Sequence, residues 1–261
     1  MNELVEELTE VAERFAVCVR VPGRARQDIG YDRGATEMFP AASVIKVGIM
    51  SCLLSDVTEG RYRLTDSVEI GPEHVVGGAG VLFEMEPNRS YTLAELCRLM
   101  MVVSDNTASN ACLRQVGMER LNDFFDRREY QARVRRFFMN PVVDGRDNQM
   151  TAESAALMLD DLYRGVGLNS NLRDFAVGCL RRQQYREKIP LMLPVEVPVG
   201  HKTGELEGVR HDAAFVEADS PYILVIFTAR GGAPWLVDHA MAQCSLEVFH
   251  LHTAILRSAS L

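Results

Sequence analysis

The stretch Ser43-Val44-Ile45-Lys46 places a serine three residues before a lysine, at the start of an apolar run that continues to Leu54. Residues three apart share one face of a helix, so Lys46 Nζ can reach Ser43 Oγ. A serine hydroxyl is a weak nucleophile until a base takes its proton, and a lysine can be that base only when burial or a positive neighbour lowers its pKa. We therefore predict a helix that begins at Ser43, with free N–H groups that suit an oxyanion.

Lysine is rare in this chain. Three of the 28 basic residues are lysines and the remaining 25 are arginines. Lys46 and Lys202 stand in short motifs with a serine or a threonine, whereas Lys188 has no such setting. A buried lysine can lose its proton, which a guanidinium cannot do. The pattern indicates one lysine in proton transfer and one as a fixed positive charge, with Lys202 as a candidate positive neighbour of Lys46.

A second motif, Ser104-Asp105-Asn106, adds polar side chains that suit acyl chemistry. The Ser104 hydroxyl can relay a proton to a leaving nitrogen. The Asn106 amide can hold a substrate carbonyl or the Lys46 ammonium. Both residues are therefore candidates for the site of Ser43.

The third motif, Lys202-Thr203-Gly204, lies in a predicted strand near the end of the chain. An ammonium beside a hydroxyl suits a substrate carboxylate, and glycine lets a strand backbone lie close to a ligand. We expect Lys202, Thr203 and Gly204 to bind a small molecule that bears a carboxylate near the scissile bond.

The three motifs, in this order and with their flanks, resemble those of the class A β-lactamase-like serine hydrolases, the penicillin-recognising enzymes. The likeness covers roughly residues 10–255. It implies an acyl-enzyme on Ser43, with an oxyanion hole made by the N–H groups of Ser43 and Glu205. It further implies that Lys46 and Ser104 transfer protons. Lys202 and Thr203 would bind the carboxylate of the substrate.

One feature of that family is missing. Class A β-lactamases carry a glutamate, between the second and third motifs, that activates the deacylating water. The corresponding stretch here, 135–148, has no glutamate, and Met139 or Asn140 stands at the expected place. Asp144 and Asp147 are the nearest carboxylates, and arginines beside them favour ion pairs that anchor the loop. We expect slow deacylation of β-lactams.

The order of predicted elements is a helix, strands, a long helical insert, strands and a helix, which indicates an α/β (α+β) fold. We expect an antiparallel sheet flanked by the N- and C-terminal helices, with an inserted all-helical lobe, as in β-lactamases and transpeptidases. The chain would be one domain, 1–261, with sub-lobes 1–40 plus 196–261 and 41–195. The expected segments are helices over 3–15, 44–54, 93–100, 107–116, 118–127 and 236–256, a helix opening at 151, and strands over 16–21, 29–31, 37–39, 197–201, 213–216 and 222–228.

Composition narrows the partners. The net charge of −8 and a pI of about 5.3 argue against nucleic acid or an anionic membrane as the main partner. No stretch has the length of a membrane span and no signal peptide is evident, so we expect a cytoplasmic protein. No cofactor motif or metal-ligand spacing occurs. The six cysteines form no CxxC pair and are expected to be reduced core thiols: Cys18, Cys52, Cys97, Cys112, Cys179 and Cys244.

Three functions remain open on these grounds. Hydrolysis of β-lactams by a serine hydrolase leads, by the resemblance. An intracellular hydrolase of esters, amides or D-peptides is the second, because the usual deacylating glutamate is missing. A penicillin-binding or sensor-like protein that is acylated without turnover is the third. The oligomeric state is not indicated.

Overall fold

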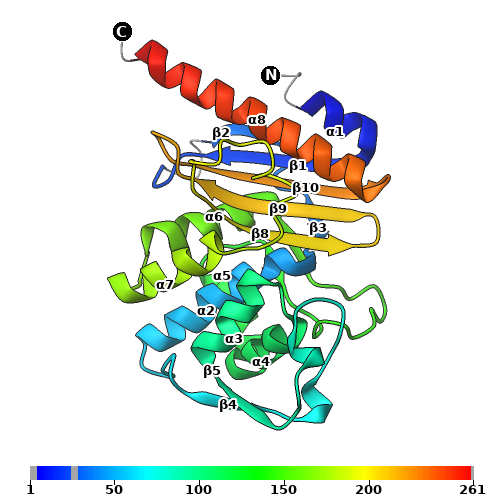
Figure 1. Cartoon of the computed structure of the whole chain (residues 1–261), viewed down its shortest axis with the longest axis vertical. Coiled ribbons are helices and arrows are strands. Elements are labelled where there is room, and N and C mark those ends of the chain that lie inside the picture. Colours follow the sequence, from blue (N-terminus) through cyan, green and yellow to red (C-terminus); the bar gives the residue numbers. More distant parts are fainter. Residues whose placement is uncertain (1–4, 25–28, 260–261) are drawn as a thin grey trace.

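The computed structural model describes residues 5–24 and 29–259. Its centre is a five-stranded antiparallel sheet with the strand order β2-β1-β10-β9-β8 (Figure 1). The edge strand β8 carries the third sequence motif. The strands are β1 (Ala12–Arg20), β2 (Ile29–Arg33), β8 (Val199–Leu206), β9 (Val209–Val216) and β10 (Tyr222–Gly231).

Strand β10 shows why the sheet is buried on both faces. Side chains of a strand point alternately to its two faces. Ile223, Val225 and Phe227 pack into the core on the side of the inserted helices, whereas Leu224 and Ile226 pack into the core beneath the terminal helices. A continuous apolar run is therefore needed, rather than an alternating one.

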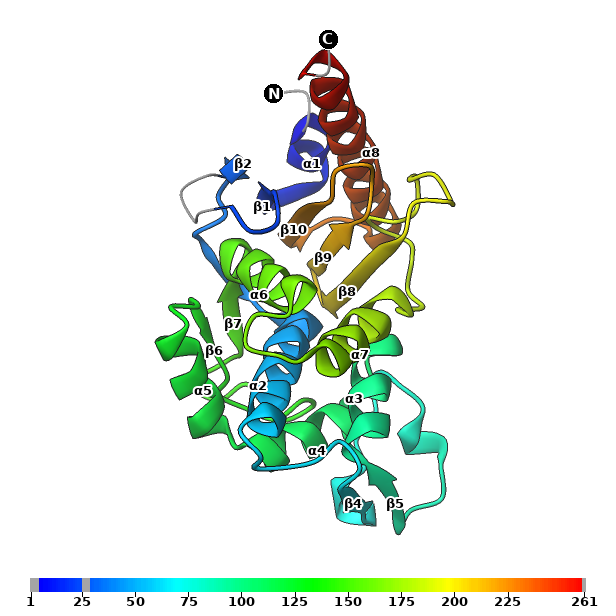
Figure 2. The ribbon, with the colours of Figure 1, turned by 90° about the vertical axis from the view of Figure 1, so that its left-hand side faces the viewer.

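The two terminal helices lie together across one face of the sheet, and the rest of the helices lie on its other side (Figures 1 and 2). They are α1 (Glu6–Val11) and α8 (Pro234–Ala259). The predicted first helix, 3–15, was too long, because β1 already begins at Ala12, which pairs with Gly231. Its first two residues lie outside the described part of the chain.

The region between β2 and β8 contains six α-helices: α2 (Lys46–Thr58), α3 (Leu93–Val102), α4 (Asn106–Val116), α5 (Met118–Arg127), α6 (Ala152–Arg164) and α7 (Ser170–Arg181). Helices α3 and α6 begin directly after the threonines at which the sequence predicted a helix start. The Thr92 side chain accepts a hydrogen bond from Glu95 N, and the Glu95 side chain accepts from Thr92 N, which is a capping box. Thr151 caps α6 in the same position.

This inserted region is not purely helical. It also holds two small sheets, one of them β3-β7-β6 and the other β4-β5. The predicted strand over 37–39 belongs to the first of these, because β3 pairs with β7 rather than with the central sheet. The division into two sub-lobes stays a prediction. The additional elements are β3 (Met38–Pro40), β4 (Ser67–Ile70), β5 (Arg89–Thr92), β6 (Ala132–Arg133), β7 (Gln149–Thr151), and the 3-10 turns η2 (Ala42–Ile45), η3 (Pro72–His74) and η4 (Leu82–Glu84).

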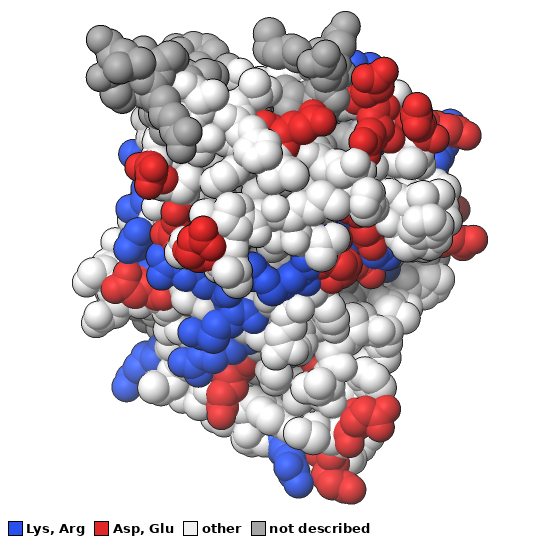
Figure 3. All heavy atoms as spheres, turned by 45° about the horizontal axis from the view of Figure 1, so that its top comes forward, with Lys and Arg blue, Asp and Glu red and all other residues white. Residues whose placement is uncertain are grey.

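The surface carries mixed charge. On the face seen in Figure 3, basic side chains gather in a band across the middle and acidic side chains flank it, so no broad basic surface appears there. All six cysteines are free and buried, as expected for core thiols. None of the described helices combines the length and apolar character needed to cross a membrane. A cytoplasmic location stays a prediction from the sequence.

Candidate active site

A cleft of about 670 Å³ lies along the edge strand β8. Its lining brings together residues from all three motifs, although these are far apart in the sequence. The two lysines of the motifs, Lys46 and Lys202, lie beneath it with no exposed surface. The motif residues and their neighbour that line the cleft are Ser43, Ser104, Asn106, Thr203 and Glu205.

Ser43 lies in the 3-10 turn η2, and Lys46 is the first residue of α2. The helix thus begins three residues later than predicted. Ala42 has a φ of +45°, a left-handed conformation that is rare for residues other than glycine. The Ser43 side chain is half-buried, and its hydroxyl makes no hydrogen bond to any described residue. It is therefore free to face a ligand in the cleft.

Lys46 Nζ is surrounded by neutral oxygen atoms. It donates hydrogen bonds to the Ser104 carbonyl oxygen at 2.7 Å, to Ser104 Oγ at 3.1 Å and to Asn106 Oδ1 at 2.9 Å. Burial, and next the charge of Lys202, lowers the pKa of Lys46 well below its ordinary value. An amine in this setting loses its proton more readily than an ordinary lysine, as a general base must.

Phe138 covers the remaining side of this amine. Its ring centroid lies 4.5 Å from Lys46 Nζ, and its backbone is clamped by Asn110, which accepts from Phe138 N at 2.8 Å and donates to the Phe138 carbonyl at 3.1 Å. The resemblance assigned Met139 or Asn140 to the position of the family's glutamate. Both side chains are exposed and border the cleft, whereas Phe138 is the residue whose ring lies over Lys46 Nζ. An aromatic ring, rather than a carboxylate, therefore lies beside the amine of Lys46.

One of the two acidic residues in the loop around Phe138 is held in an ion pair, and the other, Asp144, is exposed and pairs with no arginine among the described residues. Asp147 accepts from Arg136 Nε at 2.7 Å, as the sequence favoured. Asn148 Oδ1 accepts from the backbone of Arg135 and Arg136 and ties the two ends of the loop together. Asp147 borders the cleft, but its charge is already paired with Arg136.

The second motif is fixed by Asp105, its central residue. Asp105 Oδ1 accepts from Ala108 N and so caps α4, while Oδ2 accepts from Val81 N at 2.6 Å and Leu82 N at 2.8 Å. Ser104 has a φ of +56°, and this turn directs both its carbonyl and its hydroxyl to Lys46. A non-glycine residue in that conformation is costly and needs such support.

Lys202 meets Ser104 from the opposite side. Its Nζ donates to Ser104 Oγ at 3.1 Å and to the Thr203 carbonyl at 2.7 Å. Burial lowers the pKa of Lys202 to about 7, although Asp212 partly opposes the shift. Ser104 Oγ thus lies between the side-chain nitrogen atoms of two lysines, Lys46 and Lys202, which suits a hydroxyl that passes protons.

Gly204 was expected to let the strand lie close to a ligand, and in the structure it also packs against the turn that carries Ser43. A Cβ at this residue would lie 3.0 Å from the Val44 side chain and 3.2 Å from Ser43 N. A side chain at residue 204 would therefore crowd the turn that carries Ser43, and glycine lets β8 lie close to that turn.

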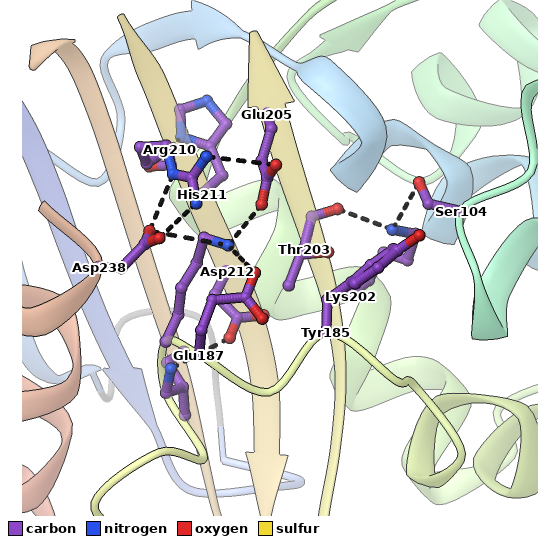
Figure 4. A network of polar contacts seen from close by, with 12 residues as sticks. Ser104, Tyr185, Glu187, Lys202, Thr203, Glu205, Arg210, His211, Asp212 and Asp238 are labelled. Atoms are coloured by element: carbon purple, nitrogen blue, oxygen red, sulfur yellow. Dashed lines mark hydrogen bonds and ion pairs between the residues drawn. The ribbon is translucent and has the colours of Figure 1, made fainter. Parts of the chain in front are cut away.

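Lys188 was not recognised from the sequence. It is as buried as the other two lysines, and it donates to Glu205 Oε1 at 2.6 Å and to Glu187 Oε1 at 2.9 Å. Arg210 lies opposite Glu205 on β9. Its Nε and Nη2 atoms donate hydrogen bonds to the two carboxylate oxygens of Asp238. Figure 4 shows Glu205, Arg210 and Asp238 on one side of Thr203, with Lys202 and Ser104 on the other. The signal in the sequence was the scarcity of lysine itself, because all three serve the cleft or its wall.

No metal site was expected, and among residues 5–24 and 29–259 no group of three His, Cys, Asp or Glu side chains is arranged to hold a metal ion. The histidines nearest the third motif serve the sheet. His201 Nδ1 lies 3.0 Å from Asp212 Oδ1, and His211 Nε2 lies 2.8 Å from the Pro40 carbonyl oxygen. Both are fully buried.

Comparison with known proteins agrees with this geometry. The model of the family described as "Beta-lactamase enzyme family" matches residues 2–250. Beta-lactamase CARB-3 of Pseudomonas aeruginosa is 24% identical over 234 residues, which span 86% of this chain and 81% of that protein.

Solved structures share the fold. A β-lactamase from Sphaerobacter thermophilus superposes with a TM-score of 0.87 at 22% identity, over 95% of this chain and 94% of that one. PBP-A superposes with a TM-score of 0.83 at 24% identity, over 97% of each chain. A leucine-to-glutamate variant of PBP-A, with the same scores, is an acyl-enzyme complex with penicillin G.

Proposed function

Because the chain belongs to the beta-lactamase enzyme family, we propose that β-lactams acylate Ser43 and that the acyl group leaves slowly. The environment of Lys46 carries this proposal. Its amine lies among neutral oxygens with a lowered pKa, as a base for Ser43 requires. Phe138, rather than a carboxylate, faces that amine.

The proposed acylation requires Lys46 Nζ to approach Ser43 Oγ, because the hydrogen bonds of Lys46 in the described structure go to Ser104 and Asn106 instead. The neutral amine of Lys46 takes the Ser43 proton while Ser43 Oγ forms a bond to the carbonyl carbon of the lactam. The carbon–nitrogen bond of the lactam breaks, and Ser104 Oγ, which lies within hydrogen-bond distance of Lys46 and Lys202, passes a proton to the leaving nitrogen. The N–H groups of Ser43 and Glu205 are the proposed oxyanion hole, and the Asn106 side chain borders the acyl group.

Deacylation needs a water molecule and a base that activates it. The described loop that carries Phe138 presents only Asp147 to the cleft, and Arg136 already binds that carboxylate. The complex of the PBP-A variant with penicillin G is a precedent for an acyl-enzyme on this fold. A protein that accumulates the acyl-enzyme therefore fits the cleft better than a rapid β-lactamase.

Turnover of an uncharged ester or amide is the second candidate. Phe83, Met139, Tyr185 and Leu206 are exposed apolar side chains that line the cleft, and they suit an apolar acyl group. Such a substrate would use the same Ser43 chemistry, and its acyl-enzyme would need the same activated water for release.

Intact-protein mass spectrometry tests the proposal. Wild-type protein mixed with benzylpenicillin or nitrocefin should gain the mass of one ligand and keep it for many minutes, while the Ser43→Ala variant should gain none. Nitrocefin colour should appear only as a stoichiometric burst.

Three outcomes contradict the proposal in different ways. Sustained nitrocefin hydrolysis without a lasting adduct would show a working β-lactamase and overturn slow release. An adduct of equal mass on Ser43→Ala would place the nucleophile elsewhere. If neither an adduct nor a hydrolysis product is observed, β-lactams are rejected as ligands. Esters and amides are then the compounds to test.

A further inference from the structure

The wall of the cleft next to the third motif carries an acidic side chain. Glu205 directly follows Gly204 on β8, borders the cleft, and has 42% of its side chain exposed. Lys202 and Thr203 on the same strand are the groups that the resemblance assigns to a ligand carboxylate. A carboxylate of the protein therefore stands beside the position expected for a carboxylate of the ligand.

Glu205 binds the two cations behind it. Its Oε1 accepts from Lys188 Nζ at 2.6 Å, and its Oε2 lies 3.2 Å from Arg210 Nη1. The contact with Arg210 is a cross-strand pair, because Glu205 and Arg210 lie opposite each other in the β8–β9 ladder. The Lys188 side chain has no exposed surface and that of Arg210 has 16%.

The other partners of these cations complete their neutralisation. Arg210 also binds Asp238 of α8, and Lys188 also binds Glu187. Two cations thus face three carboxylates, and two of the three, Glu187 and Glu205, border the cleft. Arg136 is the one arginine among the cleft-lining residues, and Asp147 binds it.

We propose that Glu205 is a specificity-determining residue, whose carboxylate satisfies Lys188 and Arg210 from within the protein and thereby disfavours a ligand carboxylate beside β8. The preferred acylating ligand is uncharged at that position, such as an ester or a neutral amide. This inference rests on the proposed acylation of Ser43 and names the class of compound that the cleft prefers.

The protonation state of Lys202 also disfavours a ligand carboxylate beside β8. Burial lowers its pKa to about 7, so near neutral pH only part of the protein carries a full charge there. A partly neutral lysine attracts an anion weakly, and the repulsion from Glu205 acts against it. The expectation of a carboxylate-bearing substrate, drawn from the motif alone, did not include this side chain.

A matched pair of ligands isolates the effect. Benzylpenicillin and its methyl ester differ only in one carboxylate. The second-order rate constant of Ser43 acylation is measured for both by intact-protein mass spectrometry, and the ratio of acid to ester is compared between variants. Glu205→Gln should raise this ratio about tenfold, because it frees Arg210 and Lys188 and removes a like charge.

The control is Glu187→Gln, which also removes a cleft carboxylate bound to Lys188 but leaves the Glu205–Arg210 pair in place. Its ratio should stay within about threefold of the wild-type ratio. The ratio is internal to each variant, so a partly unfolded sample or a purely structural effect changes both rates alike and leaves it unmoved.

The outcomes separate the two proposals. Adducts with an unchanged ratio in Glu205→Gln, or an equal rise in Glu187→Gln, would overturn the role of Glu205 and leave acylation of Ser43 intact. No adduct from either compound on any of the proteins would overturn acylation of Ser43 by β-lactams and this inference with it.

Discussion

Two regions beside β8 shift the pKa of a buried lysine in opposite directions. The cleft region contains Lys46 and Lys202, and the wall region contains Lys188 with its carboxylate partners. Lys46, Lys188 and Lys202 all have no exposed surface. In the cleft region, Lys46 and Lys202 donate only to neutral oxygens, and burial lowers the pKa of each. In the wall region, burial also disfavours the charge of Lys188, but Glu205, Asp212 and Asp238 outweigh it and raise the pKa of Lys188.

The difference shows that burial alone does not decide the protonation of a lysine. The charge of its partners decides whether the desolvation of the ammonium is compensated. Lys188 is a structural cation because carboxylates surround it, and Lys46 is suited to accept a proton because none does. The same residue type is thus a charge-compensated cation in one region and, in the proposed mechanism, a proton acceptor in the other.

The largest expected effect lies in the cleft region. Lys46→Met should slow acylation of Ser43 by benzylpenicillin about a thousandfold, since it removes the base. Lys46→Arg should be about as slow, because a guanidinium keeps its proton. Adduct formation followed by mass spectrometry measures both. Retained activity in Lys46→Arg would mean that only the charge of Lys46 matters. The contrast between Lys46 as a proton acceptor and Lys188 as a cation would then be wrong.

The second effect concerns stability in the wall region. Lys188→Met should lower the free energy of unfolding by about 2 kcal/mol, because Asp238 and Glu205 lose their shared cation. This is below the usual cost of breaking a buried pair, since Glu205 and Glu187 are partly exposed. The melting temperature should fall by about 4–8 °C.

Lys46→Met is the matched control in the same melting experiment. Its melting temperature should stay unchanged or rise, because it replaces a poorly compensated buried amine with an apolar side chain. Equal losses of stability in Lys46→Met and Lys188→Met would show that the two lysines are not distinguished by their partners.

The smallest effect comes from giving Lys46 the kind of partner that Lys188 has. In Phe138→Glu, the introduced carboxylate should raise the pKa of Lys46. Lys46 acts as a base only when neutral, so acylation is lost as the pH falls through its pKa. A raised pKa therefore moves the acylation profile to higher pH and slows acylation about tenfold at pH 7. The same carboxylate should shorten the lifetime of the adduct.

Acylation rates over a pH series, for the wild type, Phe138→Glu and Phe138→Gln, provide the measurement. The neutral Phe138→Gln should keep the wild-type midpoint. An identical shift in both variants would assign the effect to the lost ring rather than to charge.

Much of the site was visible in the sequence because its motifs are short and local. The spacing of Ser43 and Lys46, the cap at Thr92, and the strands that carry Lys202 and Tyr222 follow from neighbouring residues and their periodicity. The end of the first helix did not, since Ala12 to Phe15 fits either a helix or a strand until β10 pairs with it.

By itself the sequence predicted the candidate nucleophile, the candidate base and the coarse order of helices and strands. Only the tertiary structure decided which partner each buried lysine meets. The β8–β9 register places Arg210 opposite Glu205, the seating of α8 brings Asp238 to Arg210, and the clamp of Asn110 puts Phe138 over Lys46. Charge compensation depends on distances of a few ångströms between segments far apart in the chain, and no local pattern encodes those distances.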